Sequence, residues 1–316
     1  MVGQDAKLDD AGADVAILLA AYNGALYLGR QLASLLGQTH TSWHLFWRDD
    51  GSSDASLRLL RRFATEIVPG RCTEIPAGER LGPSRSFLLL LAEAAGSGAE
   101  YLAFCDQDDV WLPDKLARGL AALRAVPAGT PALYCASHVV VDAALRPLRT
   151  APPLRRPPGF PISLTHNVAA GCTILLNRAA AALILASAPP EQTLHDWWCY
   201  LVVSAAGGMI LADETPVLLY RQHGANTVGI AASLSARAWA ALRRGPAPFM
   251  RQLRDHVRAL LARPHLISPA ARPQLDRIAR ALESGLPAKA AALRAPGLLR
   301  QTMLETAVFR LWFLLG

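Results

Sequence analysis

Apolar residues in this chain occur in short runs, and each run stops at a polar cluster or a turn sequence. The first run, Val15 to Ala20, is uninterrupted and ends before Tyr22-Asn23-Gly24. A continuous apolar run of this length before a turn sequence is typical of a strand buried on both faces. Leucines then recur at helical spacing from Leu26 to Leu36, which predicts a helix packed against that strand.

The order of strand and helix repeats further along the chain. Trp43 to Trp47 predicts a second strand, and Ala55 to Ala64 predicts a following helix with Asp54 as its N-cap. Another helix is predicted for Ser86 to Ala95, before a short strand at Tyr101 to Cys105. Strands that alternate with helices indicate an α/β fold whose sheet is doubly wound, mostly parallel and Rossmann-like.

The second half of the chain is less regular. Val139 to Pro161 is rich in Pro and Arg, which favours a loop. Gly171 to Leu176 and Val217 to Tyr220 are predicted strands, and Leu194 to Ala206 is a predicted helix between them. Beyond Ala231 the sequence shifts to Ala, Leu and Arg with several prolines, so a set of short helices is expected there.

The composition is typical of a folded protein, and the positive charge is concentrated in the C-terminal part of the chain. Hydrophobic residues make up 52% and charged residues 18% of the 316 residues, enough for a large core in one domain with an extension. From Ala231 onward, 14 Lys and Arg stand against 4 Asp and Glu, a net +10, whereas the rest of the chain carries −3. Basic amphipathic helices attract anionic lipid surfaces, but such helices can also pack on the main domain with their arginines solvated.

Several features favour a cytoplasmic location. Met1 to Ala13 contains three aspartates and no apolar segment, so it does not resemble a signal peptide. The apolar stretches are shorter than the roughly 18 residues that cross a bilayer. Five scattered cysteines without metal-ligand spacing fit a reduced protein better than a disulfide framework. A cytoplasmic chain with a flexible N-terminus at residues 1–13 is therefore expected.

Polar clusters follow three of the predicted strands directly. Tyr22-Asn23-Gly24 follows the first strand, Asp49-Asp50-Gly51-Ser52 the second, and Asp106-Gln107-Asp108-Asp109 the third in this series. Open α/β sheets bind their ligands at the carboxyl ends of the strands. The three clusters are therefore predicted to share one binding site.

The carboxylates of Asp106, Asp108 and Asp109 repel one another unless a cation neutralises them. Hard oxygen ligands at a strand end suit Mg²⁺ or Mn²⁺, which join carboxylates to substrate phosphates. The alternative is a solvated acidic turn that caps a helix starting near Trp111. His223, in a polar loop after a strand, is either a metal or phosphate ligand or a surface residue.

Other carboxylates are candidates for binding and catalysis. Asp49 or Asp50 can accept a hydrogen bond from a ribose hydroxyl or a base imide, although an ordinary Asp-Gly turn has the same sequence. Asp196 begins a predicted helix beside Trp197 and Trp198, where partial desolvation would suit a general base. The alternative is a carboxylate that stabilises the helix N-terminus, with the tryptophans in the core.

Two basic residues near these clusters, Arg85 and Lys115, are candidates for contacts with a diphosphate, and solvated charges are the alternative.

Together, the ordered motifs resemble glycosyltransferase family 2 of the GT-A fold, and most closely its bacterial rhamnosyltransferase-like branch. The resemblance covers roughly Asp14 to Gly229. The segments that carry it are Ala20-Ala21-Tyr22-Asn23-Gly24, Arg48-Asp49-Asp50-Gly51-Ser52-Ser53-Asp54, Leu81-Gly82, Phe104 to Leu116, Gly171-Cys172-Thr173, His195-Asp196-Trp197-Trp198 and Tyr220 to Thr227.

The resemblance implies a GT-A catalytic domain at residues 14–229 and a basic helical extension at residues 230–316. It also implies roles for matching positions. Donor-binding candidates are Ala21, Tyr22, Asn23, Asp49 or Asp50, Arg85, Asp106 and Gln107. The metal-site candidates are Asp106, Asp108 and His223, and the candidate catalytic base is Asp196.

The function implied by this resemblance is inverting sugar transfer that depends on Mn²⁺ or Mg²⁺. The sugar would be L-rhamnose from dTDP-L-rhamnose, and the acceptor a saccharide or lipid-linked saccharide in cell-surface polysaccharide synthesis. Expected partners are the nucleotide-sugar donor, that acceptor and an anionic membrane surface on the inner face of the cytoplasmic membrane. Nucleic acid is not an expected partner.

The motifs depart from the family pattern at two positions. Arg48 stands where an apolar or small residue usually precedes the Asp pair, and His195 replaces an acidic residue before Asp196. A nucleotidyltransferase is an alternative, but Ala21-Tyr22-Asn23-Gly24 is not the Gly-rich, basic phosphate loop that such enzymes carry. A non-catalytic sugar-binding scaffold is another, and the retained aspartates argue against it.

Overall fold

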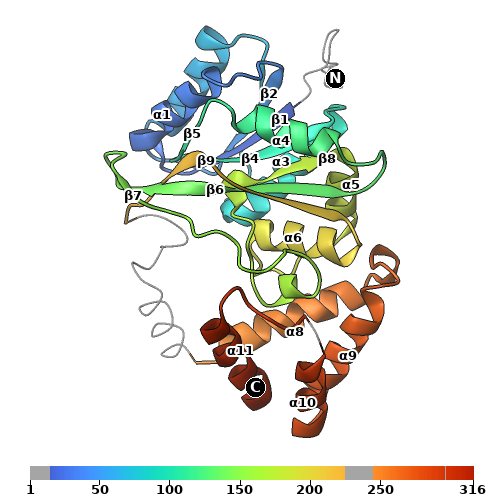
Figure 1. Ribbon diagram of the computed structural model, residues 1–316. Helices are drawn as coiled ribbons and strands as arrows, with labels where there is room; N and C mark the ends of the chain where they lie inside the picture. Colours follow the sequence, from blue (N-terminus) through green and yellow to red (C-terminus); the bar gives the residue numbers. More distant parts are fainter. Residues whose placement is uncertain (1–14, 225–244, 296) are drawn as a thin grey trace.

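The computed structural model describes residues 15–224, 245–295 and 297–316 (Figure 1). The predicted flexible N-terminus at residues 1–13 lies outside the described residues. So do Ala225, Asn226 and Thr227 of the last motif, and the first part of the predicted extension, residues 230–244.

Within the described residues, a mixed sheet of nine strands forms the centre of the fold. The strands are β1 (Val15–Ala21), β2 (Trp43–Asp49), β3 (Cys72–Glu74), β4 (Tyr101–Asp106), β5 (Val110–Trp111), β6 (Ala132–Val141), β7 (Pro147–Thr150), β8 (Leu175–Asn177) and β9 (Met209–Arg221). Their order is β3-β2-β1-β4-β8-β6-β9-β5, with β7 paired to β6. Parallel pairing joins β3 to β2, β2 to β1, β1 to β4, and β6 to β9. Antiparallel pairing joins β8 to β4 and β6, β5 to β9, and β7 to β6.

Helices cover both faces of this sheet, which confirms the predicted α/β fold. The helices are α1 (Ala25–Leu36), α2 (Ser56–Arg62), α3 (Gly82–Gly96), α4 (Lys115–Arg124), α5 (Arg178–Ala186), α6 (His195–Ala205), α8 (Ala247–Leu261), α9 (Arg272–Glu283), α10 (Leu286–Arg294) and α11 (Met303–Leu315). Residues of α1, α2 and α4 contribute to the core on one face. Residues of α3, α5 and α6 contribute to the core on the other.

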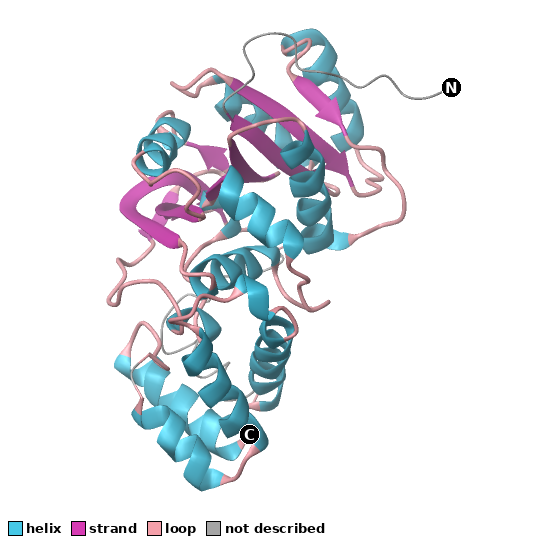
Figure 2. Ribbon diagram, turned by 90° about the vertical axis from the view of Figure 1, so that its right-hand side faces the viewer, coloured by secondary structure: helices cyan, strands magenta, loops and turns pink. Residues whose placement is uncertain are grey.

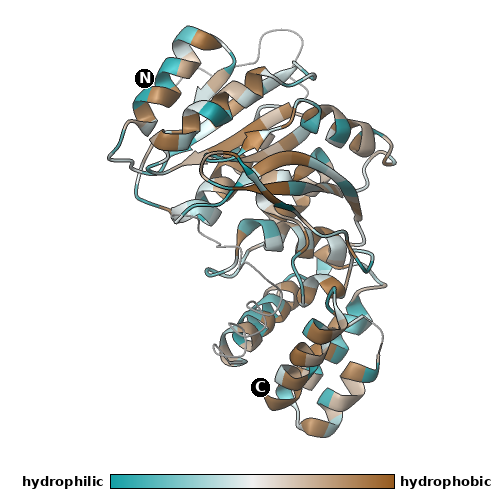
Figure 3. Cartoon of the chain, turned by 60° about the vertical axis from the view of Figure 1, so that its left-hand side comes forward, coloured by the Kyte–Doolittle hydropathy of each residue, from teal (hydrophilic) through white to brown (hydrophobic). Residues whose placement is uncertain are grey.

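The alternation of side chains along β1 explains its apolar sequence. Ile17 and Leu19 belong to the core beneath α1, whereas Leu18 belongs to the core beneath α3, and all three are fully buried. A strand covered on both faces needs apolar residues at consecutive positions. Figure 3 shows hydrophobic residues concentrated on the strands of this sheet.

Strand register brings the predicted polar clusters to one edge of the sheet. Ala21 of β1 pairs with Asp49 of β2, and Ala20 of β1 pairs with Asp106 of β4. Because these strands are parallel, their carboxyl ends lie side by side. The segments that follow them therefore start from neighbouring positions, as the sequence predicted.

Two predictions of secondary structure are wrong in part. The segment from Val139 to Pro161 is not all loop, because β6 continues to Val141 and β7 pairs with it. Pro147 is compatible with β7 because the strand is paired on one side only. Gly171–Thr173 forms a 3-10 turn before β8, since the Thr173 hydroxyl and backbone N–H both donate to the Ala170 carbonyl.

The C-terminal helices form a second, smaller body packed on α6 (Figures 1 and 2). Trp198, Leu201 and Val202 on the outer side of α6 share a core with apolar residues of α8, α9 and α11. The start of α11 is fixed by a capping box, in which Thr302 and Glu305 exchange hydrogen bonds. No helix in the described parts of the chain has the length and apolar character needed to span a membrane.

Candidate active site

A ledge formed by Ala21, Tyr22 and Asn23 lies at the end of β1, and hydrogen bonds with Gln107 fix its position. Gln107 Oε1 accepts a hydrogen bond from the Tyr22 backbone N–H at 2.8 Å, and Gln107 Nε2 donates to the Tyr22 carbonyl at 3.0 Å. Gly24 fits here because a Cβ at this position would overlap the Gln107 side chain. Asn23 is left-handed, with φ 49°, and its Oδ1 accepts from the Ser53 N–H at 2.8 Å. The ledge is thus tied to both β2 and β4.

The predicted cap at Asp54 also joins this ledge to the loop after β2. The residue before α2 is Ala55 rather than Asp54, and it has no side-chain oxygen to cap the helix. The Asp54 carboxylate instead accepts from the backbone N–H groups of Ser56 and Ala25. It therefore joins the first residues of α1 and α2.

Asp49 and Asp50 have different surroundings although they are adjacent. Asp49 Oδ1 accepts from the N–H groups of Gly51 and Ser52, while its Oδ2 is buried and has no hydrogen-bond partner among the described residues. Both oxygens of Asp50 are occupied, because they accept from the N–H groups of Leu81 and Gly82 at 2.8 and 2.7 Å. Asp49 thus keeps a vacant acceptor, whereas Asp50 holds the start of α3.

Arg48 explains one departure from the family pattern. The side chain is buried, lies 3.3 Å from Asp50 Oδ1, and donates to the Glu79 carbonyl at 2.8 Å. A buried guanidinium needs a charged partner. The unusual residue therefore serves the Asp50 carboxylate and the loop that precedes α3.

Asp106 is surrounded by negative charge. Burial, followed by the charges of Asp108 and Asp196, raises the pKa of its carboxyl to about 7, and Lys115 opposes the shift. Among the described residues, no group donates a hydrogen bond to this carboxylate. The charge of Asp106 is therefore poorly compensated by the protein itself.

His223 contacts Asp108, a member of this acidic cluster. The His223 Nε2 and Asp108 Oδ2 atoms are 2.8 Å apart, and the His223 ring lies 4.5 Å from the ring of Tyr27 in α1. Arg221, two residues earlier, donates to the Asp108 carbonyl at 2.7 Å and lies over the Tyr27 ring. The structure thus brings two predicted metal-site residues, Asp108 and His223, into contact.

Asp109, Cys172 and Lys115 form a fully buried layer next to the half-buried Asp106 and Asp108. Ligand atoms of Asp106, Asp109 and Cys172 lie within 4.8 Å of one another. Burial raises the pKa of Cys172 and Asp109 well above their usual ranges, so the thiol stays protonated. Burial also lowers the pKa of Lys115 to about 8, and its Nζ lies 3.3 Å from the centre of the Trp111 ring. Lys115 is therefore buried below the cluster and not exposed toward a diphosphate.

Asp196 lies in the first turn of α6, close to this cluster. Its carboxylate accepts from the N–H groups of Trp197 at 2.6 Å and Gly171 at 3.2 Å. Burial raises the pKa of Asp196 to about 6, although these hydrogen bonds and one from Asn167 oppose the shift. Trp198 is buried and Trp197 half-buried in the core shared with the extension. A desolvated carboxylate with a pKa near neutrality is suited to accept a proton.

His195 accounts for the second departure from the family pattern. Its ring stacks on Phe87 at 4.3 Å and meets Phe104 edge-on at 4.9 Å. Burial lowers its pKa to about 3, so the imidazole is neutral. His195 therefore packs beneath the site as an apolar ring, beside the charged Asp196.

The remaining predicted residue, Arg85, is exposed in the first turn of α3. Sequence reasoning did not assign Asn167 and Cys172, which contact Asp196 and Asp109. The Gly-Cys-Thr segment was part of the family resemblance and indicated this region. Asn167 follows the Pro- and Arg-rich stretch, and no pattern in the sequence indicated a role for it.

Comparison with known proteins decides the family. The model of glycosyl transferase family 2 matches residues 16–179, which is more than half of the chain. The chain belongs to glycosyltransferase family 2. It is a nucleotide-sugar transferase with the GT-A architecture, and the matched region contains both acidic clusters.

Individual relatives agree with this assignment. The dTDP-rhamnosyl transferase RfbG of Shigella flexneri is 24% identical over 226 residues, which cover 69% of this chain and 76% of the relative. An uncharacterized glycosyltransferase of Nostoc is 36% identical over 104 residues, 33% of this chain and 31% of the relative. The structure of S. aureus TarS 1-349 in complex with UDP-GlcNAc aligns over 85% of this glycosyltransferase and 72% of TarS, with a TM-score of 0.56 and 13% identity. This likeness supports the fold.

Proposed function

We propose that this glycosyltransferase moves L-rhamnose from dTDP-L-rhamnose to a saccharide or lipid-linked saccharide with inversion at the anomeric carbon. The observation that carries the proposal is the convergence of Asp106, Asp108 and Asp196. Asp196 is close enough to raise the pKa of Asp106, although the two residues are 90 positions apart. The candidate metal ligands and the candidate base therefore face one site.

Asp106, Asp108 and His223 would hold Mn²⁺ or Mg²⁺. The donor set fits such an ion, because the charge of Asp106 is poorly compensated and carboxylate oxygens are the ligands these cations prefer. Cys172 stays protonated, which makes it a poor ligand for a hard cation. A bound divalent ion neutralises the negative charge that develops on the leaving diphosphate.

The donor nucleoside is proposed to lie on the ledge formed by Ala21, Tyr22 and Asn23. Asp49 Oδ2 is the vacant acceptor at this place and suits a ribose hydroxyl or a base N–H. Gln107 supports the ledge through both atoms of its amide, and Asp106 lies at the adjacent strand end. Arg85, exposed on α3, would approach the diphosphate.

Asp196 is proposed as the general base. It would take the proton from an acceptor hydroxyl while that oxygen bonds to the anomeric carbon. The bond from this carbon to the diphosphate oxygen breaks at the same time, so the configuration inverts. The hydrogen bonds from Gly171 and Trp197 orient the carboxylate for this role. The choice of sugar and nucleotide is supported by the Shigella relative.

The proposal is tested with a panel of dTDP-L-rhamnose, UDP-GlcNAc and GDP-mannose, with Mn²⁺ or with EDTA. Nucleotide release should be fastest from dTDP-L-rhamnose and should require Mn²⁺ or Mg²⁺. NMR of the product should show an α-L-rhamnoside formed from the β donor. Faster release from another donor would overturn the donor assignment. Metal-independent release would overturn the role of the acidic cluster.

We also propose that the C-terminal extension docks on an anionic membrane surface at the cytoplasmic face. Leu304, Leu311 and Leu315 of α11 are 61, 50 and 71% exposed and lie on one side of the helix. Arg310 is exposed beside them, and arginines of α8 and α9 add positive charge. Apolar side chains flanked by basic residues suit an interfacial helix.

Sedimentation with vesicles of phosphatidylglycerol and phosphatidylcholine tests this docking. The protein should sediment at low salt and much less at 0.5 M NaCl, because salt screens surface charges. Leu304→Ser with Leu311→Ser should reduce binding while catalysis in solution is retained. Equal sedimentation of this variant and the unaltered protein would contradict docking through α11.

A further inference from the structure

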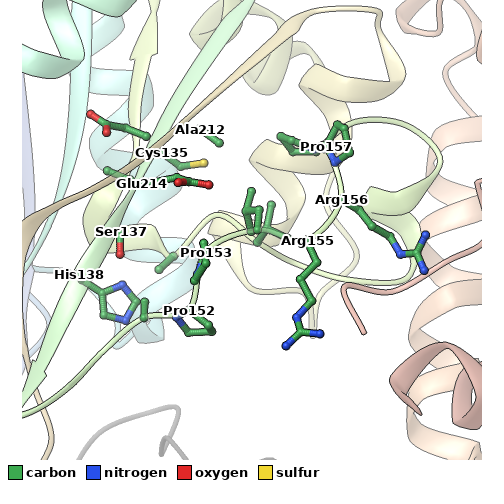
Figure 4. A pocket seen from close by; sticks show the side chains of 17 residues that line it. Cys135, Ser137, His138, Pro152, Pro153, Arg155, Arg156, Pro157, Ala212 and Glu214 are labelled. Atoms are coloured by element: carbon green, nitrogen blue, oxygen red, sulfur yellow. The ribbon is translucent and has the colours of Figure 1, made fainter. Parts of the chain in front are cut away.

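A pocket of about 350 Å³ lies between β6, β9 and the Pro- and Arg-rich segment at residues 151–158 (Figure 4). None of the donor-binding or metal-site candidates lines it. Small-molecule sites commonly have volumes of about 300–1,000 Å³. The pocket is therefore large enough for a ligand of its own.

The pocket adjoins the reaction centre at two points. Ala170 lines it, and the next residue, Gly171, donates its N–H to the Asp196 carboxylate. His138, also in the lining, has its ring centre 5.3 Å from that of Tyr220. Tyr220 lies near the acidic cluster, and its pKa is raised by burial, then by interactions with the Cys172 thiol and the carboxylates of Asp106 and Asp109. A ligand in the pocket would therefore lie next to the segment that orients the proposed base.

Two polar atoms of the pocket residues lack partners. Ser137 Oγ and His138 Nδ1 are buried and make no hydrogen bond in the part of the chain that the structure describes. An unsatisfied buried polar group costs about 1–3 kcal/mol, which a ligand group can remove. Burial, aided by Arg149, lowers the pKa of His138 to about 4, so its ring is neutral. A neutral imidazole and a hydroxyl both suit the hydroxyl groups of an uncharged ligand.

The opposite wall combines prolines with Arg155 and Arg156, and the C-terminal extension holds it in place. Pro152 and Pro153 present ring surfaces to the pocket (Figure 4). Gln301, which is buried, accepts from the N–H groups of Arg155 at 2.8 Å and Arg156 at 3.0 Å. It also donates to the Arg156 carbonyl at 3.2 Å. These bonds fix the loop to the C-terminal extension.

We propose that this pocket binds a saccharide ring of the acceptor, with Ser137 and His138 contacting its hydroxyls and Gln301 positioning the proline wall. A sugar ring presents both hydroxyl groups and an apolar C–H face, which match the two walls. The inference rests on the proposed transfer reaction, because only the acceptor must lie beside Asp196. It adds a binding site that the donor candidates do not include.

Saturation-transfer NMR with three soluble probes tests the site. The probes are methyl α-D-glucoside, methyl N-acetyl-β-D-glucosaminide and methyl α-L-rhamnoside, each up to 100 mM. At least one should bind the unaltered protein. Ser137→Ala combined with His138→Phe removes both polar groups but keeps an aromatic ring next to Tyr220. The double variant should bind that probe about tenfold more weakly, as expected for two lost hydrogen bonds.

The matched control carries the same substitutions far from the pocket, Ser97→Ala with His265→Phe. Ser97 follows α3, His265 is exposed in the extension, and neither residue lines the pocket. This control should bind the probe like the unaltered protein. Failure of all three probes to bind at 100 mM would overturn the inference, and so would equal binding by the pocket variant.

Gln301 supplies a second comparison. Gln301→Ala should weaken probe binding several-fold, whereas Gln301→Glu, which keeps the acceptor for two N–H groups, should restore part of it. Gln274→Ala in α9 is the matched control. Binding of dTDP and hydrolysis of dTDP-L-rhamnose should stay unchanged in the Ser137, His138 and Gln301 variants. If the unaltered protein neither bound dTDP nor hydrolysed dTDP-L-rhamnose, that result would count against the proposed function, and not against the pocket.

Discussion

Asp50 and Asp106 lie at the carboxyl ends of β2 and β4, the two strands that flank β1, yet their charges are neutralised differently. Asp50 is buried and receives two backbone N–H groups and the guanidinium of Arg48. Asp106 receives no hydrogen bond from the described residues and faces Asp108 and Asp196. The carboxylate oxygens of Asp50 are hydrogen-bonded within the protein, whereas those of Asp106 remain available to a ligand. Substitutions at the two positions should therefore affect different properties.

The largest effect on activity is expected at Asp106. Asp106→Asn removes a proposed metal ligand, so Mn²⁺-dependent turnover should fall roughly 10⁴-fold, which corresponds to several kcal/mol of lost charge stabilisation. The melting temperature should not fall, because the substitution removes repulsion among carboxylates. Steady-state kinetics and calorimetry of the same preparation measure both. Normal turnover that is still abolished by EDTA would place the metal elsewhere.

Asp196→Asn should have the next largest effect. The change preserves the shape of the side chain and removes the proton acceptor, so kcat should fall roughly 10² to 10⁴-fold. The Kd for dTDP should change little, because Asp196 is proposed to act on the acceptor. Rapid-quench kinetics and titration with dTDP separate the two effects. Weaker dTDP binding with an unchanged kcat would reassign Asp196 to the donor.

Asp50→Asn should affect stability rather than chemistry. It leaves the buried Arg48 without a charged partner, and loss of one partner of a buried pair costs several kcal/mol. The free energy of unfolding should drop by about 3 kcal/mol in urea titrations. Activity at a temperature where the variant is folded should stay close to normal. A stable but inactive variant would indicate that Asp50 contacts the donor after all.

The pH dependence of turnover sharpens the role of Asp196. A general base must be unprotonated, and burial raises the pKa of this carboxyl to about 6. The kcat should therefore be constant above about pH 7 and fall tenfold per unit below pH 6. A stopped assay in constant ionic strength buffers from pH 5 to 9 measures the profile. A flat profile down to pH 5 would exclude Asp196 as the titrating base.

The sequence predicted the positions of the acidic clusters but not their different surroundings. The apolar runs and the turn residues that follow them predicted β1, β2 and β4. Because these strands are parallel, Ala21, Asp49 and Asp106 lie at the same edge of the sheet. The contacts that separate Asp50 from Asp106 are mostly distant in sequence, because the N–H donors of Asp50 are 31 and 32 positions away and Asp196 is 90 positions from Asp106. Their different roles depend on tertiary contacts.

The later elements show the same limit. The 3-10 turn at Gly171–Thr173 has the apolar content of a strand, and a hydroxyl contact with Ala170 decides its form. The contact between Gln301 and the loop at Arg155 joins residues 146 positions apart. Amphipathic helices in the extension were predictable from composition. The loop that they hold was not, because the contacting residues follow no period.

Calorimetric titration of Mn²⁺ in the presence of dTDP tests the central claim most directly. The claim is that the Asp106 cluster, and not the Asp50 pair, is completed by a divalent cation. The unaltered protein and Asp50→Asn, measured at a temperature where both are folded, should bind Mn²⁺ with the same stoichiometry. Asp106→Asn should show no saturable binding. Equal Mn²⁺ affinity in Asp106→Asn and the unaltered protein would contradict the account.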